Sequence, residues 1–371
     1  MSRTHASALA LVLALGATSA FAAEGSLTVK GRCMLADKAG KLSPVVGTRV
    51  EIWDSVGAPK DTDWVKGCEH GVGNACVGQG VTDATGAFTV KGDLRKMLDS
   101  GGHIIAGGEH LYARCWLRNG NALFLSTATK IPLPYEVVQS IPNAKNGAST
   151  AGDLTFKATA GDAARMFNVL QRTTDRLSKA GLGADLKPVM VLHPSGTETK
   201  PRAPGVPVYQ ASYAQFLTIH FIEGRPDQTV AHEFGHTTEF MYRVAFNDDA
   251  LFSQLSKTFQ SRQERHGQIG GGHMYWSSTN PQFAWTEGWG HFTALYGLSP
   301  SLDGNCKPWA TYEKGAEADR IKIEGNIGCR LYDLSKKYGY KAIWDAVKSS
   351  KASSFPELLK ALGKPWVNPH P

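Results

Sequence analysis

The feature that most constrains the fold of this chain is a pair of histidines four residues apart, in the segment Asp227 to Tyr242 (DQTVAHEFGHTTEFMY). On an α-helix, residues four apart lie one turn above each other, so His232 and His236 can offer two ring nitrogens to one metal ion. Zinc suits such a site because it binds nitrogen and carboxylate oxygen in tetrahedral geometry. Glu233 stands beside the first histidine, where it can accept a proton from a water that the metal activates. The segment therefore predicts a helix that carries a zinc site.

A third metal ligand is expected from the segment Gln282 to Tyr296 (QFAWTEGWGHFTALY). Large aromatic residues recur in it at helical spacing, at Trp285, Trp289, Phe292 and Tyr296. This spacing predicts a buried helix, and a buried helix rarely holds a carboxylate without a partner. Glu287 is therefore the candidate ligand, with a local cap or salt bridge as the alternative. His291 follows on the same face and is expected to orient a zinc-bound histidine.

These two segments together resemble the gluzincin metallopeptidases, the superfamily of the thermolysin-like enzymes, in which H-E-x-x-H is followed by a helix reading W-x-E-G-W. The match rests on five residues: His232, Glu233, His236, Glu287 and Gly288. The resemblance implies a zinc ion held by both histidines and Glu287, with Glu233 as general base and a peptide or protein as substrate. Two features depart from the family. The segment 237–286 is longer than its thermolysin-like counterpart, and His291 stands where those enzymes have an aspartate.

The group that stabilises the oxyanion in such a reaction is left open by the sequence. Residues 267–275 contain three consecutive glycines and suit a lid over the site. The segment 322–340 resembles a helix that several gluzincin families place across the cleft, often with a tyrosine shortly before it, but Ile323 stands at that position here. The candidates are His273, Tyr275, Tyr312 and Tyr332.

Residues 1–22 have the features of a secretory signal peptide, with a basic start, a short apolar run and small residues before the expected cut. No later stretch approaches about 18 uninterrupted apolar residues, so no integral membrane segment is expected after signal removal. The sequence therefore predicts a secreted or periplasmic protein.

All six cysteines follow this leader, and an even number in an oxidising compartment favours disulfides. The preferred pairs keep each disulfide inside one domain: Cys33 with Cys115, Cys68 with Cys76, and Cys306 with Cys329. A metal site formed by Cys68, His70 and Cys76 is the alternative for the second pair.

The length and patterning predict a multidomain protein. Residues 23–128 contain short alternating segments between turn residues, which is typical of an all-β sandwich. The runs TRVEIWD and GQGVTDATGAFTV resemble transthyretin-like or carboxypeptidase regulatory-like domains. Residues 129–160 are expected to be a connector, and residues 161–371 an α+β, mainly helical, gluzincin-like domain.

Several local features complete the prediction. The segment Asp162 to Ala180 predicts an amphipathic helix capped by Asp162 and ended by Gly181. Asp83 is interpreted as a turn former. Calcium binding is the alternative for four acidic residues, Asp54, Asp61, Asp63 and Asp83. His193 and His220 lie in strand-like runs and are interpreted as core histidines.

The formal net charge of +7 comes without a basic cluster interleaved with aromatics, so no nucleic-acid partner is expected. The oligomeric state is left open. The second function that fits the sequence is an exported binding or adhesion protein whose zinc is structural.

Overall fold

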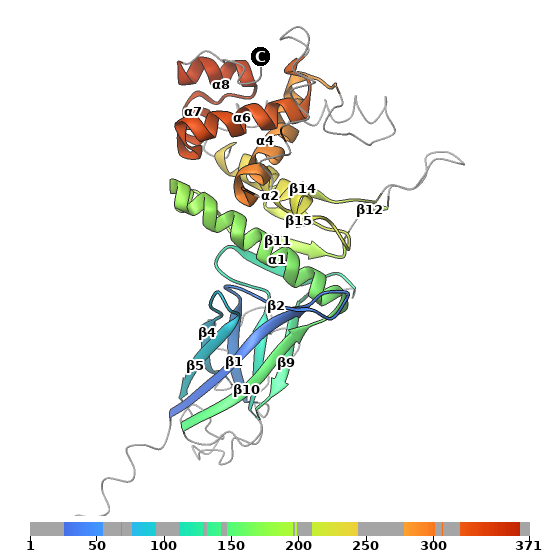
Figure 1. The fold of residues 1–371 in the computed structure, drawn as a ribbon, viewed down its shortest axis with the longest axis vertical. Helices are drawn as coiled ribbons and strands as arrows, with labels where there is room; N and C mark the ends of the chain where they lie inside the picture. The colour runs from blue at the N-terminus through green and yellow to red at the C-terminus, as the bar shows by residue number, and fades with distance from the viewer. Residues whose placement is uncertain are drawn as a thin grey trace, which may run out of the picture. The chain divides into compact units, whose positions relative to one another are not determined.

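The computed structural model describes residues 26–54, 68, 76–93, 111–128, 132–141, 147–195, 197–198, 210–243, 278–300, 306 and 320–363. The chain divides into two compact units, each built from several stretches of sequence (Figure 1). Unit 1 consists of Met1–Met34, Val46–Trp116 and Glu136–Thr155, and unit 2 of Leu35–Val45, Leu117–Tyr135 and Phe156–Pro371. The expected signal peptide lies outside the described residues. Within them, every helix is too short or too polar to span a bilayer.

Unit 1 is built from two β-sheets. In the first sheet, β1 (Ser26–Ala36) pairs with β10 (Gly147–Phe156) and, in antiparallel orientation, with β5 (Ala87–Asp93). Strand β2 (Leu42–Pro44) lies in the stretch Leu35–Val45 of unit 2. The second sheet has the antiparallel order β4-β3-β6-β9, with β4 at Cys76–Val81, β3 at Arg49–Asp54, β6 at Leu111–Trp116 and β9 at Glu136–Ser140. The all-β character expected for this part of the chain is confirmed.

The disulfide between Cys33 and Cys115 joins the two sheets, because Cys33 lies in β1 and Cys115 in β6. Both cysteines are fully buried. In β1, Leu27 and Val29 alternate with more exposed residues, as a strand with one face on a core requires. The other two disulfides join Cys68 to Cys76 and Cys306 to Cys329. These are the three pairs preferred from the sequence, and they fit an extracellular or periplasmic protein.

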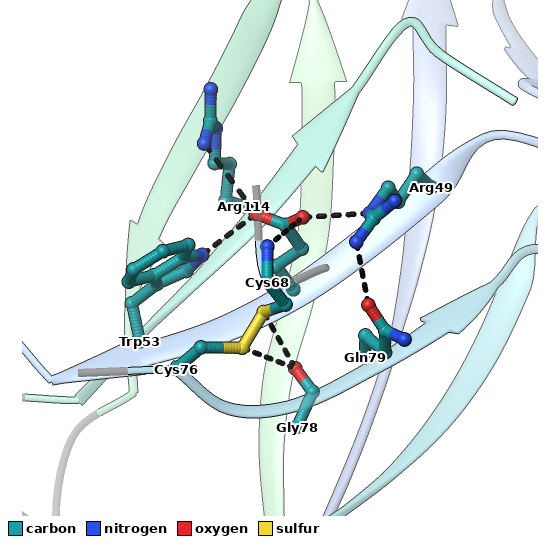
Figure 2. Close-up of a disulfide and its surroundings, with 8 residues drawn as sticks. Arg49, Trp53, Cys68, Cys76, Gly78, Gln79 and Arg114 are labelled. Atoms are coloured by element: carbon teal, nitrogen blue, oxygen red, sulfur yellow. Dashed lines mark hydrogen bonds and ion pairs between the residues drawn. A yellow bond between two sulfur atoms is a disulfide. The ribbon is translucent and has the colours of Figure 1, made fainter. Parts of the chain in front are cut away.

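A buried carboxylate, Glu51 of β3, is the second feature that holds unit 1 together. Figure 2 labels its partners Arg49, Trp53, Cys68 and Arg114. Oε1 of Glu51 pairs with Nε of Arg49 at 2.6 Å and accepts from the backbone N–H of Cys68 at 3.2 Å. Its Oε2 accepts from Nε1 of Trp53 at 2.8 Å and lies 3.4 Å from Nη1 of Arg114. A carboxylate removed from water needs such partners, so the Cys68–Cys76 disulfide also holds a donor against Glu51.

Two alternative metal sites are possible in unit 1 from the sequence, one at Cys68 and Cys76 and one at Asp83 and its acidic neighbours. Cys68 and Cys76 form a disulfide, so they do not bind a metal. Oδ1 of Asp83 accepts three hydrogen bonds from its own turn, namely from N and Oγ1 of Thr85 and N of Ala87. This is the turn-forming role expected for Asp83, and Asp61 and Asp63 lie outside the described residues.

We expect removal of the Cys33–Cys115 disulfide by double alanine substitution to lower the free energy of unfolding of unit 1 by about 4.5 kcal/mol. The reason is that this bond closes a loop with a sequence separation of 82 residues, which restricts the unfolded chain strongly. Removal of Cys68–Cys76, with a separation of 8, is expected to cost about 2.5 kcal/mol on the same basis. Urea denaturation of both variants measures the difference, and a smaller loss for Cys33–Cys115 would contradict the explanation.

Unit 2 combines a mixed sheet with helices (Figure 1). The sheet order is β14-β15-β11-β7-β8, with β14 at Tyr213–Gln215, β15 at Thr218–His220, β11 at Val189–His193, β7 at Ala122–Ser126 and β8 at Leu133–Pro134. The three central strands are parallel. A separate two-stranded sheet pairs β12 (Thr197–Glu198) with β13 (Gln210–Ala211). The helices are α1 (Ala158–Leu177), α2 (Asp227–Arg243), α4 (Pro281–Leu298), α6 (Glu324–Tyr338), α7 (Tyr340–Ser350) and α8 (Phe355–Leu362), with a π-helical turn at Ser178–Leu182 after α1.

The division of the chain differs from the expected boundaries at 128 and 160. Strand β7 was assigned to the N-terminal sandwich, but it pairs in parallel with β11 at the centre of the unit 2 sheet. The expected connector contains β9 and β10, and unit 1 includes all of β9 and β10 as far as Thr155. An alternating segment does not reveal which sheet it joins. No residue of β9 is buried, and in β10 only Ala151, Leu154 and Phe156 are, so neither segment has a strong apolar pattern.

The sequence predicts that Asp162 caps α1. This prediction is wrong, because the helix begins one turn earlier, at Ala158. Oδ2 of Asp162 instead accepts from the backbone N–H of Gly224 at 2.8 Å and lies 3.3 Å from Nε2 of His193. The other ring nitrogen of His193, Nδ1, lies 2.9 Å from the hydroxyl of Tyr135. His193 is therefore a core histidine with partners on both sides, as the sequence suggested. Burial alone would raise the pKa of Asp162, but the bonds from His193, Gly224 and Arg165 lower it to about 2.

We expect Asp162→Asn to lower the free energy of unfolding at neutral pH by on the order of 2 kcal/mol. The pKa of this carboxyl falls from 3.8 to about 2 on folding, so its contribution is present above about pH 4 and is lost as the pH falls toward 2. Unfolding of both chains by urea at pH 7 and pH 3 measures this. A difference between the two chains that stays constant from pH 7 to pH 3 would contradict the assignment.

Candidate metal centre

Helices α2 and α4 carry the expected ligands and approach each other through glycines. A Cβ added at Gly235 of α2 would lie 2.7 Å from Cα of Gly290 in α4. A Cβ at Gly290 would lie 2.8 Å from two ring atoms of His232. Contacts this short do not occur between real side chains, so both positions require glycine. The two glycines let the backbones approach, and this brings the histidine rings of α2 against α4.

Hydrogen bonds fix the rotation of α4 against α2. Trp289 Nε1 donates to Oγ1 of Thr238 at 3.0 Å, and Trp285 Nε1 donates to the hydroxyl of Tyr242 at 3.2 Å. Thr286, the residue before Glu287, donates from Oγ1 to Oε1 of Glu239 at 3.2 Å. All three bonds are buried, and burial makes each donor costly to leave unpaired. Trp285 and Trp289, whose spacing predicts this helix, therefore also form polar contacts with α2.

The structure brings together the three expected metal ligands, His232, His236 and Glu287. Nε2 of His232 lies 3.1 Å from Nε2 of His236 and 3.1 Å from Oε2 of Glu287, and Nε2 of His236 lies 3.3 Å from the same oxygen. A tetrahedral zinc ion with ligand bonds of about 2.0–2.1 Å would hold its donor atoms about 3.3–3.4 Å apart. The three atoms fit a metal ion with little rearrangement, and within the described ranges no other such group of His, Cys, Asp or Glu occurs.

The donor atoms suit more than one metal ion. Two imidazole nitrogens and one carboxylate oxygen match catalytic zinc sites, which leave a fourth position for water. The same set of ligands also binds iron(II) in non-haem oxygenases. The local alternative for Glu287, a cap or salt bridge within its own helix, is not what the structure shows, because its carboxylate faces both histidines.

His291 lies behind His232, on the side away from the ligand atoms. The two Nδ1 atoms are 3.0 Å apart, and Nε2 of His291 lies 3.9 Å from Oε1 of Glu324. Burial and, to a smaller extent, the neighbouring His232 lower the pKa of His291, Glu324 and Glu287 oppose this, and the net result is a pKa of about 4. His291 is thus neutral near pH 7, and its position agrees with the orienting role expected from the sequence.

Glu324 is the residue of this cluster that the sequence analysis missed. It is 1% exposed, although it is an acid in the first turn of α6. The signal was the same as for Glu287, a carboxylate in a helix with apolar neighbours, but it stands at a helix start, where acids are common without any partner.

The remaining candidates are placed as follows. Glu233 is buried on α2, between the two histidines in sequence. His273, Tyr275 and Tyr312 lie outside the described residues, so their expected role stays a prediction. The hydroxyl of Tyr332 donates to Oγ of Ser299 at 2.8 Å, at the end of α4. His220 is half-buried, and its Nδ1 lies 2.9 Å from Oγ of Ser195 while its ring stacks on Tyr213.

Comparison with known proteins does not identify a family. No protein-family model matches the chain, and no curated protein matches it. Among solved structures, a 9R-lipoxygenase from Cyanothece PCC8801 shares 15% identity over 45% of this chain and 26% of its own, with a TM-score of 0.22. A proposed carbohydrate-binding protein from Pseudomonas aeruginosa shares 11% identity over 35% of this chain and 88% of its own, with a TM-score of 0.21. Likenesses this weak support no conclusion about this protein.

We expect Gly290→Ala to weaken metal binding about tenfold or more, because the added methyl group would displace the ring of His232. Helix propensity alone would make this change favourable by up to about 1 kcal/mol, so a loss would report the contact and not the helix. The affinity is measured by competition with a chromophoric chelator. Gly120→Ala is the control, since a Cβ at Gly120 meets nothing within 4 Å. Unchanged affinity in Gly290→Ala would contradict the packing argument.

Proposed function

We propose that the protein is an exported zinc peptidase whose catalytic centre is formed by His232, His236, Glu287 and Glu233. The observation that carries the proposal is the convergence of the three ligand atoms within 3.1–3.3 Å, with Glu233 adjacent to the first ligand in the chain. The choice of zinc over iron rests on Glu233, because an acid beside the ligands suits hydrolysis.

Each residue has one role in the proposed reaction. When bound, the metal would polarise both the scissile carbonyl and the attacking water. His232, His236 and Glu287 hold the ion, and His291 supports His232 from behind. Glu233 accepts the proton of the water and delivers it to the leaving amine. The donor to the oxyanion is sought first in His273 and Tyr275.

The proposal extends to the arrangement of the chain. Unit 2 would be a gluzincin-like catalytic domain, and unit 1 a transthyretin-like accessory sandwich. The support for unit 1 is its pair of sheets joined by Cys33–Cys115 and the turn at Asp83. The expected leader and the three disulfides support export.

We expect Glu233→Gln to keep one zinc ion per chain and to lose peptide hydrolysis by a factor of about 10² to 10⁴, because the amide cannot accept the proton. Metal content is measured by elemental analysis, and cleavage with a mixed peptide library. The exposed Glu223→Gln on the same unit is the control and should cleave like the unmodified chain. If all three chains hold zinc and none cleaves any peptide, the peptidase proposal is wrong and an exported binding protein with a structural metal is favoured.

A further inference from the structure

A line of buried polar side chains runs outward from the metal site through three helices. It begins at His232 of α2, whose Nε2 faces the other ligands and whose Nδ1 faces Nδ1 of His291 in α4 at 3.0 Å. It ends at Glu324 of α6, whose Oε1 lies 3.9 Å from Nε2 of His291. The three residues are 8%, 6% and 1% exposed, so all three lie in the protein interior.

The two Nδ1 atoms can form a hydrogen bond only if one carries a proton and the other offers a lone pair. A histidine that binds a metal through Nε2 carries its proton on Nδ1. His232 is then the donor, and His291 must accept at Nδ1. The proton of neutral His291 is consequently on Nε2, the atom that faces Glu324. A carboxylate on that side favours this tautomer over the opposite one, which would place two N–H groups against each other.

The position of Glu324 is built into the packing of α6. Glu324 is the first residue of α6, where the positive end of the helix dipole favours a negative charge. One turn later, Gly328 lets α6 lie against His291, since a Cβ there would be 2.6 Å from Cβ of His291. On the other helix, Gly288 accommodates Ile327 in the same way. The first turns of α6 are thereby held close to α4 and to His291.

We propose that Glu324 is a positioning residue of the metal site, which fixes the tautomer of His291 and so keeps Nε2 of His232 available to the ion. This inference rests on the metal site of the proposed function, and it assigns to Glu324 no contact with substrate.

The test is the zinc affinity of the unmodified chain and of Glu324→Gln, measured by competition with a chromophoric chelator. Loss of an outer partner of this kind typically weakens metal binding about 10- to 100-fold, and that range is expected here. Glu357→Gln is the matched control, because Glu357 is also an acid in the first turn of a helix, α8, but is exposed. Affinity of Glu324→Gln equal to that of the control would overturn the proposal.

A double-mutant cycle separates positioning from a general effect on folding. If Glu324 acts through His291, Glu324→Gln should weaken zinc binding much less in a His291→Ala background than in the unmodified chain. Equal effects in both backgrounds would mean that Glu324 acts by another route, and the proposal would be wrong.

A second measurement needs no substitution and so does not depend on whether the variants fold. In the zinc-loaded chain labelled with ¹⁵N-histidine, the proton of His291 is expected on Nε2 and that of His232 on Nδ1. A proton on Nδ1 of His291 would overturn the proposal.

The outcomes for positioning and for peptidase activity are independent of each other. A chain that binds zinc with the expected dependence on Glu324 but cleaves no peptide keeps the positioning role and loses the proposed function. If the unmodified chain cleaves peptides and Glu324→Gln binds zinc normally, the proposed function stands and the positioning role is wrong. A chain that takes up no zinc overturns both.

Discussion

The close approach of α2 and α4 is the contact on which the metal site depends. Each helix carries only part of the site, since α2 supplies two histidines and α4 supplies the carboxylate. Gly235 and Gly290 let the two backbones come within contact distance, and neither could be replaced by alanine without a shift of Gly290 or of His232. Buried hydrogen bonds from the tryptophans of α4 then set the rotation that points Glu287 at the histidines. The geometry of the ligands is thus a result of the packing of α2 against α4.

The same packing decides the electrostatics of the site. His232, Glu287 and His291 are buried, and a buried carboxylate needs a compensating partner. A divalent ion would be such a partner at one end, and Glu324 stands at the other end, at the start of α6. In unit 1, two arginines and two N–H groups surround the buried carboxylate of Glu51.

The sequence revealed the parts of the site that depend on short-range spacing. The two histidines lie on one helix, and the aromatic spacing around Glu287 defined a second, so both elements and their ligands could be predicted. Residues whose role depends on distant partners were harder. Asp162 looked like a helix cap, yet its partners Gly224 and His193 follow much later in the chain. Strand β7 looked like part of the sandwich, because parallel pairing with β11 leaves no local pattern. Glu324 was missed for the same reason, since an acid at a helix start is usually exposed.

The most direct test of this account is X-ray absorption spectroscopy at the metal edge of the purified chain, which identifies both the ion and its ligands. The account predicts zinc with about four nitrogen or oxygen ligands at about 2.0–2.2 Å, including the outer-shell signal of two imidazoles. It also predicts that Glu287→Gln alters this first shell while both imidazoles remain. A site with sulfur ligands, with fewer than two imidazoles or with no metal at all would contradict the three-ligand site described between α2 and α4.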